Sequence, residues 1–216
     1  MDFAGAYSWP NLSFILQGFG MTLLVAVLSI LFSFILGTIL GIIRYARIPV
    51  LSRLLAILID LLRNLPLLLI IYFAYIVLPN LGIKMTPFWA AITALTLFEG
   101  AMISEIVRGG LASIDRGQIE ASRSSGLSYV QTMHHIILPQ ALRRMVPPLV
   151  SQFISLLKDT SLAIIISLPE IMHNVQILQG HSPNYVIPAL LLASLLYFTV
   201  NYTLSIISRR QEAKEI

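Results

Sequence analysis

Long apolar runs separated by short polar segments dominate the pattern of this chain. The first run, residues 18–43, contains no charged residue and is long enough to cross a bilayer as a tilted helix. Four further apolar runs follow, at residues 54–78, 88–107, 148–168 and 186–207. A membrane-spanning helix needs about 20 apolar residues. We therefore predict an all-α membrane protein with five transmembrane helices that form a single domain over residues 1–216.

The composition supports a membrane protein and excludes several other classes. Hydrophobic residues make up 57% of the chain and charged residues 11%, whereas a soluble domain has about 25% charged residues. This deficit excludes a soluble enzyme, a nucleic-acid-binding protein and a disordered tail, and it makes the lipid bilayer the expected surroundings. The absence of cysteine excludes disulfides, Cys-ligated zinc, iron–sulfur clusters and thiol catalysis.

The distribution of basic residues predicts the orientation of the chain. Eleven of the 14 Lys and Arg residues lie in the segments 44–53, 108–144 and 209–214. Positive charge favours the cytoplasmic side, so we expect the N-terminus outside and the C-terminus in the cytoplasm. Asp2 is the only charged residue before Arg44, so a signal peptide's basic region is missing and the first apolar run is expected to be retained.

Residues 108–146 form the one soluble-looking stretch. Asp115 and Ser128 are each followed three residues later by Gln, a spacing typical of a capping box. Gly126 suits the end of a helix, and Pro139 suits the start of the next. We predict two short helices with a turn at Gly126. Residues 1–17 are expected to be an interfacial lead-in, and residues 169–185 an outer loop.

A motif in this hairpin resembles a known family. Glu120-Ala121-Ser122 is followed by Gly126 and then by Ile136-x-Leu138-Pro139. This spacing is similar to the EAA loop of bacterial ABC importer permeases, with Ser122 in place of an alanine. Four other segments, at residues 63–68, 104–109, 137–143 and 156–162, resemble permeases for polar amino acids. The resemblance covers residues 12–210.

The resemblance implies the membrane subunit of an importer that moves polar or charged amino acids into the cell by alternating access. The implied setting is a bacterial inner membrane. The implied partners are a second permease copy or a paralogue, cytoplasmic ATPase subunits that bind ATP-Mg, and an extracytoplasmic substrate-binding protein. The chain itself has no phosphate-binding G-x-x-x-x-G-K-[ST] loop, so we expect no cofactor in it. Residues 113–140 are the implied coupling segment, and its expected ATPase-coupling residues are Glu120, Ala121, Ser122, Gly126, Ile136, Leu138 and Pro139.

Ionisable residues at membrane depth are the candidates for substrate contact. At 1.5 Å per residue, Glu99 lies about 13 Å from the cytoplasmic end of its run and Lys158 about 15 Å. Glu99 would meet the ammonium of an amino acid and Lys158 its carboxylate, with hydrogen bonds from Asp159, Thr160 and Ser161. The alternative is a structural pair, either Glu99 with Lys158 or Lys158 with Asp159. Because the family usually has a small polar residue at the position of Glu99, a cationic or amine-rich substrate is also open.

Other features have a structural interpretation. Glu105 with Arg108, and Asp60 with Arg63, have the spacing of ion pairs on one helix. Pro66 predicts a kink, and the small residues Gly37 and Gly41 predict close helix packing. His134 and His135 are adjacent, so they point in different directions and do not predict a metal site.

Two functions from other classes compete with the importer. An intramembrane hydrolase would need a Ser–His pair, paired aspartates or a His-Glu-x-x-His motif at membrane depth, and the sequence has none. An ATPase-independent channel or carrier would not need the EAA-like hairpin. The sequence does not identify the solute, and it does not decide between a homodimer and a heterodimer.

Overall fold

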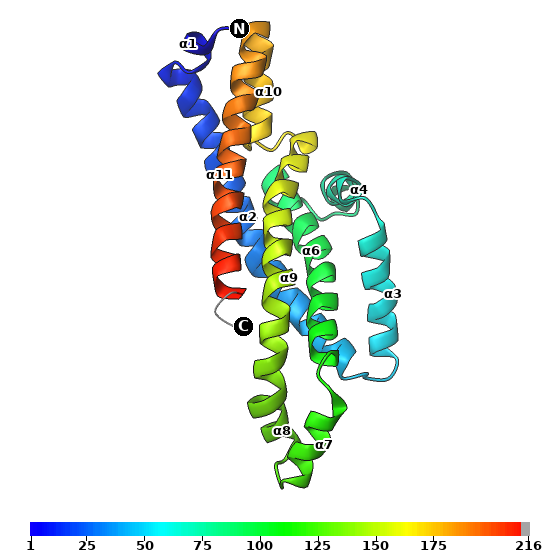
Figure 1. Cartoon of the computed structure of the whole chain (residues 1–216). Coiled ribbons are helices and arrows are strands. Elements are labelled where there is room, and N and C mark those ends of the chain that lie inside the picture. Colours follow the sequence, from blue (N-terminus) through cyan, green and yellow to red (C-terminus); the bar gives the residue numbers. More distant parts are fainter. Residues whose placement is uncertain (213–216) are drawn as a thin grey trace.

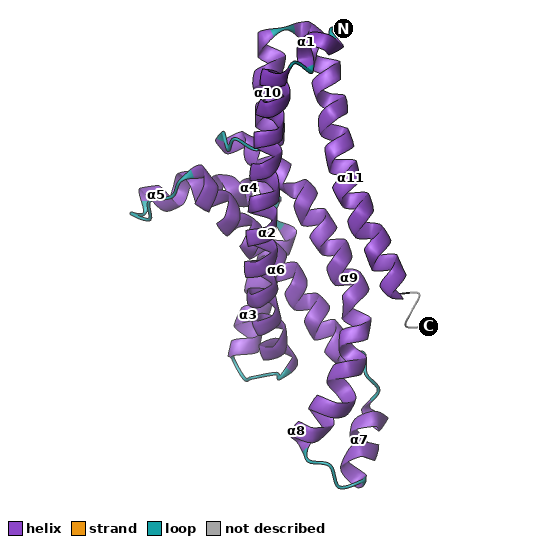
Figure 2. Ribbon diagram, turned by 90° about the vertical axis from the view of Figure 1, so that its left-hand side faces the viewer, coloured by secondary structure: helices purple, strands orange, loops and turns teal. Residues whose placement is uncertain are grey.

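The computed structural model describes the backbone of residues 1–212 and the side chains of residues 1–206, and helices make up almost all of this part of the chain (Figures 1 and 2). The predicted all-α class is confirmed. Arg209 and Arg210 lie beyond the described side chains, and Lys214 lies outside the described residues. The elements are α1 (Phe3–Ala6), α2 (Trp9–Tyr45), α3 (Leu51–Asn64), α4 (Leu67–Tyr72), η1 (Phe73–Val77), α5 (Leu78–Asn80), α6 (Pro87–Ala112), α7 (Arg116–Ser124), α8 (Tyr129–Thr132), η2 (Met133–Ile137), α9 (Leu138–Asp159), η3 (Thr160–Ile166), α10 (Ile171–His181), η4 (Pro183–Tyr185) and α11 (Val186–Glu212).

Four helical segments of the described chain are long and apolar enough to cross a membrane: Trp9–Tyr45, Pro87–Ala112, Tyr129–Ile166 and Pro183–Ile206. A fifth apolar segment consists of two helical halves, Leu51–Asn64 and Leu67–Asn80, which meet at an angle of 105°; together they are long and apolar enough for one crossing. Figure 2 shows α4 and α5 running sideways out of the body.

The break at Pro66 follows from the chemistry of proline. The residue before it, Leu65, is extended (φ −90°, ψ 144°), as expected where a proline ring excludes the helical conformation of its neighbour. Pro66 also has no N–H to donate into the helix. The predicted kink is confirmed, and it is sharp enough to divide the span into two helices.

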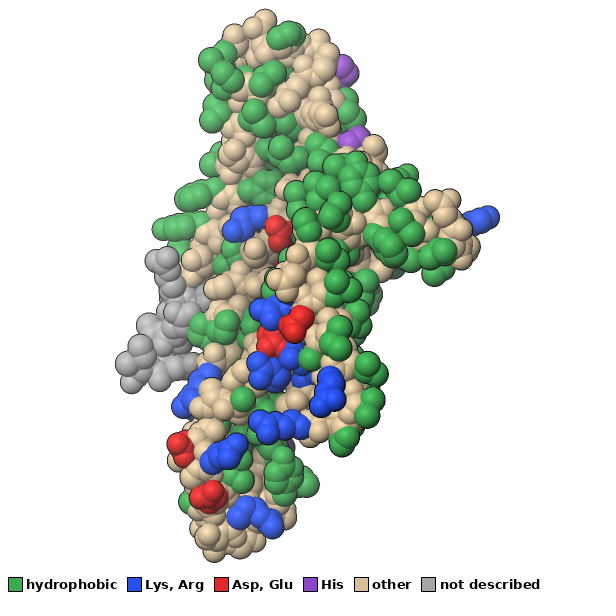
Figure 3. Space-filling view, turned by 90° about the vertical axis from the view of Figure 1, so that its right-hand side faces the viewer, with side chains coloured by type: hydrophobic (Ala, Val, Ile, Leu, Met, Phe, Trp, Pro, Cys, Tyr) green, Lys and Arg blue, Asp and Glu red, His purple; other side chains and the backbone are tan. Residues whose placement is uncertain are grey.

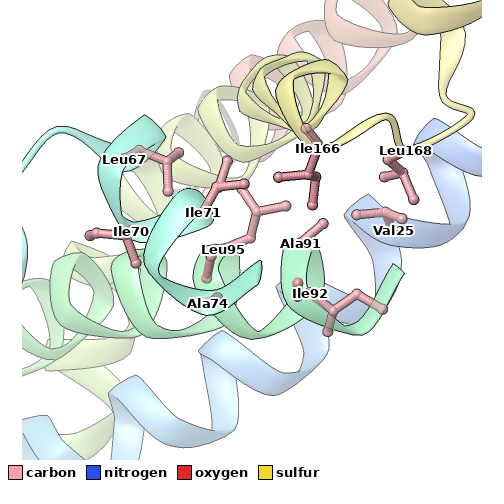
Figure 4. Packing of buried hydrophobic residues seen from close by; sticks show 13 residues of the cluster. Val25, Leu67, Ile70, Ile71, Ala74, Ala91, Ile92, Leu95, Ile166 and Leu168 are labelled. Atoms are coloured by element: carbon pink, nitrogen blue, oxygen red, sulfur yellow. The ribbon is translucent and has the colours of Figure 1, made fainter. Parts of the chain in front are cut away.

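Helices α2 and α6 pack in direct backbone contact. A Cβ atom on Gly37 would lie 2.7 Å from the Gly100 carbonyl oxygen, and one on Gly41 would lie 2.7 Å from the Ser104 carbonyl oxygen. The predicted close packing at these two glycines is therefore confirmed. Around this pair, buried side chains of α2, α4, α6 and η3 form an apolar cluster, in which Ile71, Leu95 and Ile166 come together (Figure 4).

One expected loop was wrong, and two expected spans begin inside longer helices. Residues 171–181 form helix α10 in the expected outer loop, so His173 and His181 are helical. Pro169, Gly180 and Pro183 suggested a loop, but Ile171, Val175 and Leu178 form a buried face that packs against α2 and α11. The expected lead-in is helical as α1 and the first turns of α2. The expected span 148–168 begins inside a longer helix, because α9 starts at Leu138 and runs through both Pro147 and Pro148.

Glu170 caps α10 from a fully buried position. Its carboxylate accepts hydrogen bonds from the backbone N–H groups of Met172 (3.0 Å) and His173 (2.8 Å). Burial raises the pKa of Glu170 from its ordinary value of 4.5 to about 7, although these two hydrogen bonds favour the charged form. The folded state therefore binds this proton more tightly than the unfolded state does.

We expect the thermal stability of the purified protein to fall as the pH rises from about 5 to about 8. The protonated Glu170 carboxyl is favoured in the folded state, and this contribution to stability is lost as the carboxyl ionises near its raised pKa. Each unit of difference in pKa between the folded and unfolded states is worth about 1.4 kcal/mol. Glu170→Gln keeps one acceptor oxygen for the helix N-terminus and should flatten this pH dependence. Unfolding temperatures in detergent across this range test the expectation, and an equal slope in the variant would contradict it.

Candidate functional site

The polar hairpin α7–α8 lies at the end of the molecule opposite the N-terminus (Figure 1). Asp115 caps α7 by accepting from the N–H of Gly117 (2.6 Å), and Ser128 with Gln131 forms a complete capping box on α8. Between the two helices Gly126 has φ +90°, which is unfavourable for any residue with a Cβ. The predicted turn at Gly126 and the capping box at Ser128 are confirmed.

The turn is a Schellman motif. The N–H of Gly126 donates to the carbonyl of Arg123 (3.1 Å), and the N–H of Leu127 donates to the carbonyl of Ser122 (3.2 Å). These two bonds are the pattern that closes a helix through a left-handed residue. The geometry of the hairpin therefore depends on the backbone of one glycine.

The motif residues divide into exposed and inward-facing positions. Glu120, Ala121, Leu138 and Pro139 are exposed, and Ile136 is half-buried. Ser122 is buried, and its hydroxyl donates to the carbonyl of Gln118 (2.6 Å). The outer face of α7 thus presents a carboxylate beside a small residue, an arrangement that allows another protein to approach closely.

The hairpin is fixed to the membrane helices rather than hanging free. Ile114 and Ile137 pack into a buried cluster with Ile103 and Val107 of α6 and with residues of α9. Across the base of the hairpin, the guanidinium of Arg144 donates to the carbonyl of Ser113 (2.6 Å). The hairpin is therefore packed directly against α6 and α9.

Glu99 is a fully buried carboxylate in the middle of α6. Neither of its carboxylate oxygens has a hydrogen-bond partner of good geometry within the described part of the chain, although the amide of Gln152 lies close enough to interact with it. The polar side chains that approach it, Gln152 and Asp159, both come from α9. A buried charge without a partner is costly, so this position suits a group that receives a cation from outside the chain.

The other expected substrate residues lie where α9 changes into the 3₁₀ helix η3. Lys158 is exposed and makes no ion pair with Glu99 or Asp159 among the described residues, so neither structural pair forms here. Thr160 is buried and its hydroxyl donates to the carbonyl of Leu157, while Ser161 donates to that of Lys158. Asp159 lies close enough to Glu99 to act on its charge. Short 3₁₀ stretches within helices often mark hinges.

Glu105 links two helices through two arginines. Its carboxylate accepts from Arg108 (Nη2–Oε2 2.7 Å), as the spacing predicted, and it also forms an ion pair with Arg44 of α2. The sequence did not indicate Arg44, because the contact depends on how α2 packs on α6. Asp60 and Arg63 also form their predicted pair, at 4.0 Å on an exposed surface.

Glu105→Gln is expected to lower the free energy of unfolding by about 2–4 kcal/mol, somewhat less than for a fully buried pair, because Arg44 and Arg108 are left without their carboxylate. The side chains of Arg44 and Glu105 are 13% and 18% exposed, so solvent screens the interaction only in part. Asp60→Asn is the matched control, since an exposed pair contributes about 0–1 kcal/mol. Denaturation of the purified chain in detergent measures both, and equal losses would contradict the inter-helix role of Glu105.

Comparisons with known proteins agree on one family. Residues 33–214 match the model of the binding-protein-dependent transport system inner membrane component. The chain is 61% identical to the probable glutamine ABC transporter permease protein GlnP of Bacillus subtilis over the whole of both chains, and 37% identical to the probable permease GlnM of that organism, covering 92% and 91% of the two. A solved structure described as an amino acid ABC transporter with histidines aligns with a TM-score of 0.91 at 26% identity, covering 99% of each chain.

Proposed function

Because the chain belongs to the family of binding-protein-dependent transport system inner membrane components and is the permease of an amino-acid ABC importer, we propose that the amino acid it carries is glutamine. The observation that supports this choice is the 61% identity to a probable glutamine permease along the whole chain. A channel or carrier that works without an ATPase is no longer a candidate, since the family is ATP-driven.

The proposed substrate contact is the buried carboxylate of Glu99. It has no partner among the described residues, and the α-ammonium of an amino acid would supply the missing positive charge. Asp159 adds a second negative charge near this point, and Gln152 adds an amide that can hydrogen-bond to the side-chain amide of glutamine. Lys158, Thr160 and Ser161 remain proposed contacts for a state in which the α9–η3 junction has moved.

We propose that the partner ATPase drives transport through the hairpin. Glu120, Ala121 and the Gly126 turn would dock on a cytoplasmic ATPase that binds ATP-Mg. The other proposed coupling residues are Ser122, Ile136, Leu138 and Pro139. Packing of Ile114 and Ile137 against α6 supports this route, because it ties the hairpin to the helix that carries Glu99. The proposed orientation places the N-terminus outside and the hairpin in the cytoplasm, which the arginines around it support.

Assembly is proposed to involve a second permease copy or a paralogue, two ATPase subunits and an extracytoplasmic binding protein. The test is reconstitution of the purified complex in liposomes with its binding protein, followed by uptake of labelled glutamine. Uptake should require ATP and should be competed by unlabelled glutamine more strongly than by arginine or glutamate. Preferential uptake of arginine would instead support the cationic substrate, and preference for a different polar solute would reject glutamine.

A further inference from the structure

A cavity of about 330 Å³ lies between the adjoining ends of α2 and α6 and the hairpin α7–α8. Four of its lining side chains are arginines: Arg44 on α2, Arg47 in the turn after α2, Arg108 on α6 and Arg116 on α7. We call this cavity the arginine pocket. It is separate from Glu99, which lies on α6 but does not line it, and the proposed transport cycle does not use it.

The arginine pocket carries an excess of positive charge. Glu105 is the only acidic side chain that pairs with these arginines among the described residues, and it is shared by Arg44 and Arg108. Arg47 and Arg116 form no ion pair there. Asp60 also acts on Arg44, but Asp60 is itself paired with Arg63. Four guanidinium groups against the one carboxylate that pairs with them leave a deficit of anions. Because guanidinium groups bind phosphate oxygens in a two-pronged geometry, the pocket suits a phosphate group.

An apolar groove of about 90 Å³ adjoins the arginine pocket, and Leu111 lines both. The side chains of Phe34, Ile42 and Leu142 belong to its walls, and its lining has no charged residue. A free anion would leave this groove empty, and so would the carboxylate of a protein side chain. A phosphate attached to a hydrocarbon chain would occupy both cavities, with the part of the chain nearest the phosphate inside the groove.

The arginine pocket lies at the end of the uncharged run of α2, where the surface of the bilayer is expected. The uncharged run 18–43 ends one residue before Arg44, so the pocket lies where the hydrocarbon region gives way to lipid headgroups. Exposed Ile35 and Ile39 continue the apolar surface of α2 away from it. Figure 3 shows the same division on one face of the molecule, with Lys and Arg gathered over its lower part and apolar side chains above.

We propose that the arginine pocket and its groove bind one anionic glycerophospholipid. The phosphate lies among Arg44, Arg47, Arg108 and Arg116, and an acyl chain lies along Ile42 and Leu142. Basic pockets between membrane helices on the cytoplasmic side recognise such headgroups in other membrane proteins. Since Arg116 belongs to α7 and Arg44 to α2, the bound lipid would join the hairpin to the membrane helices.

The test uses the full-length chain in detergent, with binding followed by native mass spectrometry. The probes are phosphatidylglycerol, phosphatidylcholine and inorganic phosphate. Wild-type protein should retain phosphatidylglycerol in preference to phosphatidylcholine. Arg47→Gln and Arg116→Gln should each weaken phosphatidylglycerol binding about fivefold, the usual effect of one basic residue near an anionic lipid. Arg53→Gln is the matched control, since Arg53 is exposed on α3 and does not line the pocket, and it should change nothing.

Leu142→Trp separates a lipid from a free anion. It fills the groove, so it should weaken phosphatidylglycerol binding and leave any binding of inorganic phosphate unchanged. Equal retention of phosphatidylcholine, or phosphatidylglycerol binding that is insensitive to both arginine substitutions, would overturn the proposal. If the arginine variants retained lipid but no longer co-purified with the ATPase, the pocket would be a protein contact and the proposal would also fail. None of these readouts depends on the identity of the transported amino acid.

Discussion

Glu99→Gln is expected to reduce ATP-driven uptake of glutamine by about 30-fold or more, which corresponds to the loss of about 2 kcal/mol or more when one partner of a buried charge pair is removed. The physical reason is the position of this carboxylate, which is fully buried on α6 and has no partner among the described residues. The substitution keeps the size of the side chain and removes only the charge that would receive the substrate ammonium. Initial rates of uptake across a range of glutamine concentrations measure the effect.

A structural role for Glu99 predicts a different combination of results. The Glu99→Gln substitution removes a buried charge that has no ion-pair partner. The thermal stability of the resting complex should therefore stay the same or rise. Lower uptake with undiminished stability therefore points to substrate contact, whereas a parallel loss of both points to structure. Asp60→Asn removes a carboxylate from an exposed pair and should leave uptake unchanged. An unaltered rate and substrate profile in Glu99→Gln would reject the contact.

Features with a local chemical cause could be predicted from the sequence. Pro66 breaks its helix because a proline ring excludes the helical conformation before it, and Gly126 turns the hairpin because its φ is positive. The capping box at Ser128 and the pair of Glu105 with Arg108 depend on residues three positions apart. Each of these is settled within one or two helical turns, so no knowledge of tertiary packing is needed.

The sequence predicted how deep in the membrane a charged residue lies, but not which neighbouring helix its side chain faces. Glu99 and Lys158 do lie on neighbouring helices, yet Lys158 is exposed, and the side chains near Glu99 are Gln152 and Asp159. Those two are seven residues apart, so they share one face of α9, and Lys158 is rotated by about 100° from that face. In a helix apolar on most sides, the sequence pattern does not show which face turns inward. Arg44 was missed for the same reason, since its pairing depends on the rotation of α2 against α6.

Gly126→Val should abolish most ATP-driven transport while membrane insertion and the level of the protein stay normal. Gly126 has φ +90°, and a Cβ there would meet nothing within 4 Å, so the cause would be backbone strain and not a steric clash. A residue with a Cβ pays roughly 1–2 kcal/mol in this region, and a β-branched residue adapts least well. The Schellman turn would reopen, and the angle between α7 and α8 would change.

Two further glycine substitutions separate coupling from general strain. Gly82 has nearly the same conformation (φ +92°) and equally open surroundings, but it follows α5, away from the hairpin. Gly82→Val should therefore impose a similar strain and leave transport largely intact. Gly126→Asn should be milder than Gly126→Val, because asparagine tolerates the left-handed region. Uptake and ATP hydrolysis should be assayed in parallel. Only Gly126→Val should hydrolyse ATP without taking up the substrate. Equal loss of uptake in both valine variants would trace the defect to folding and reject the turn as the coupling element.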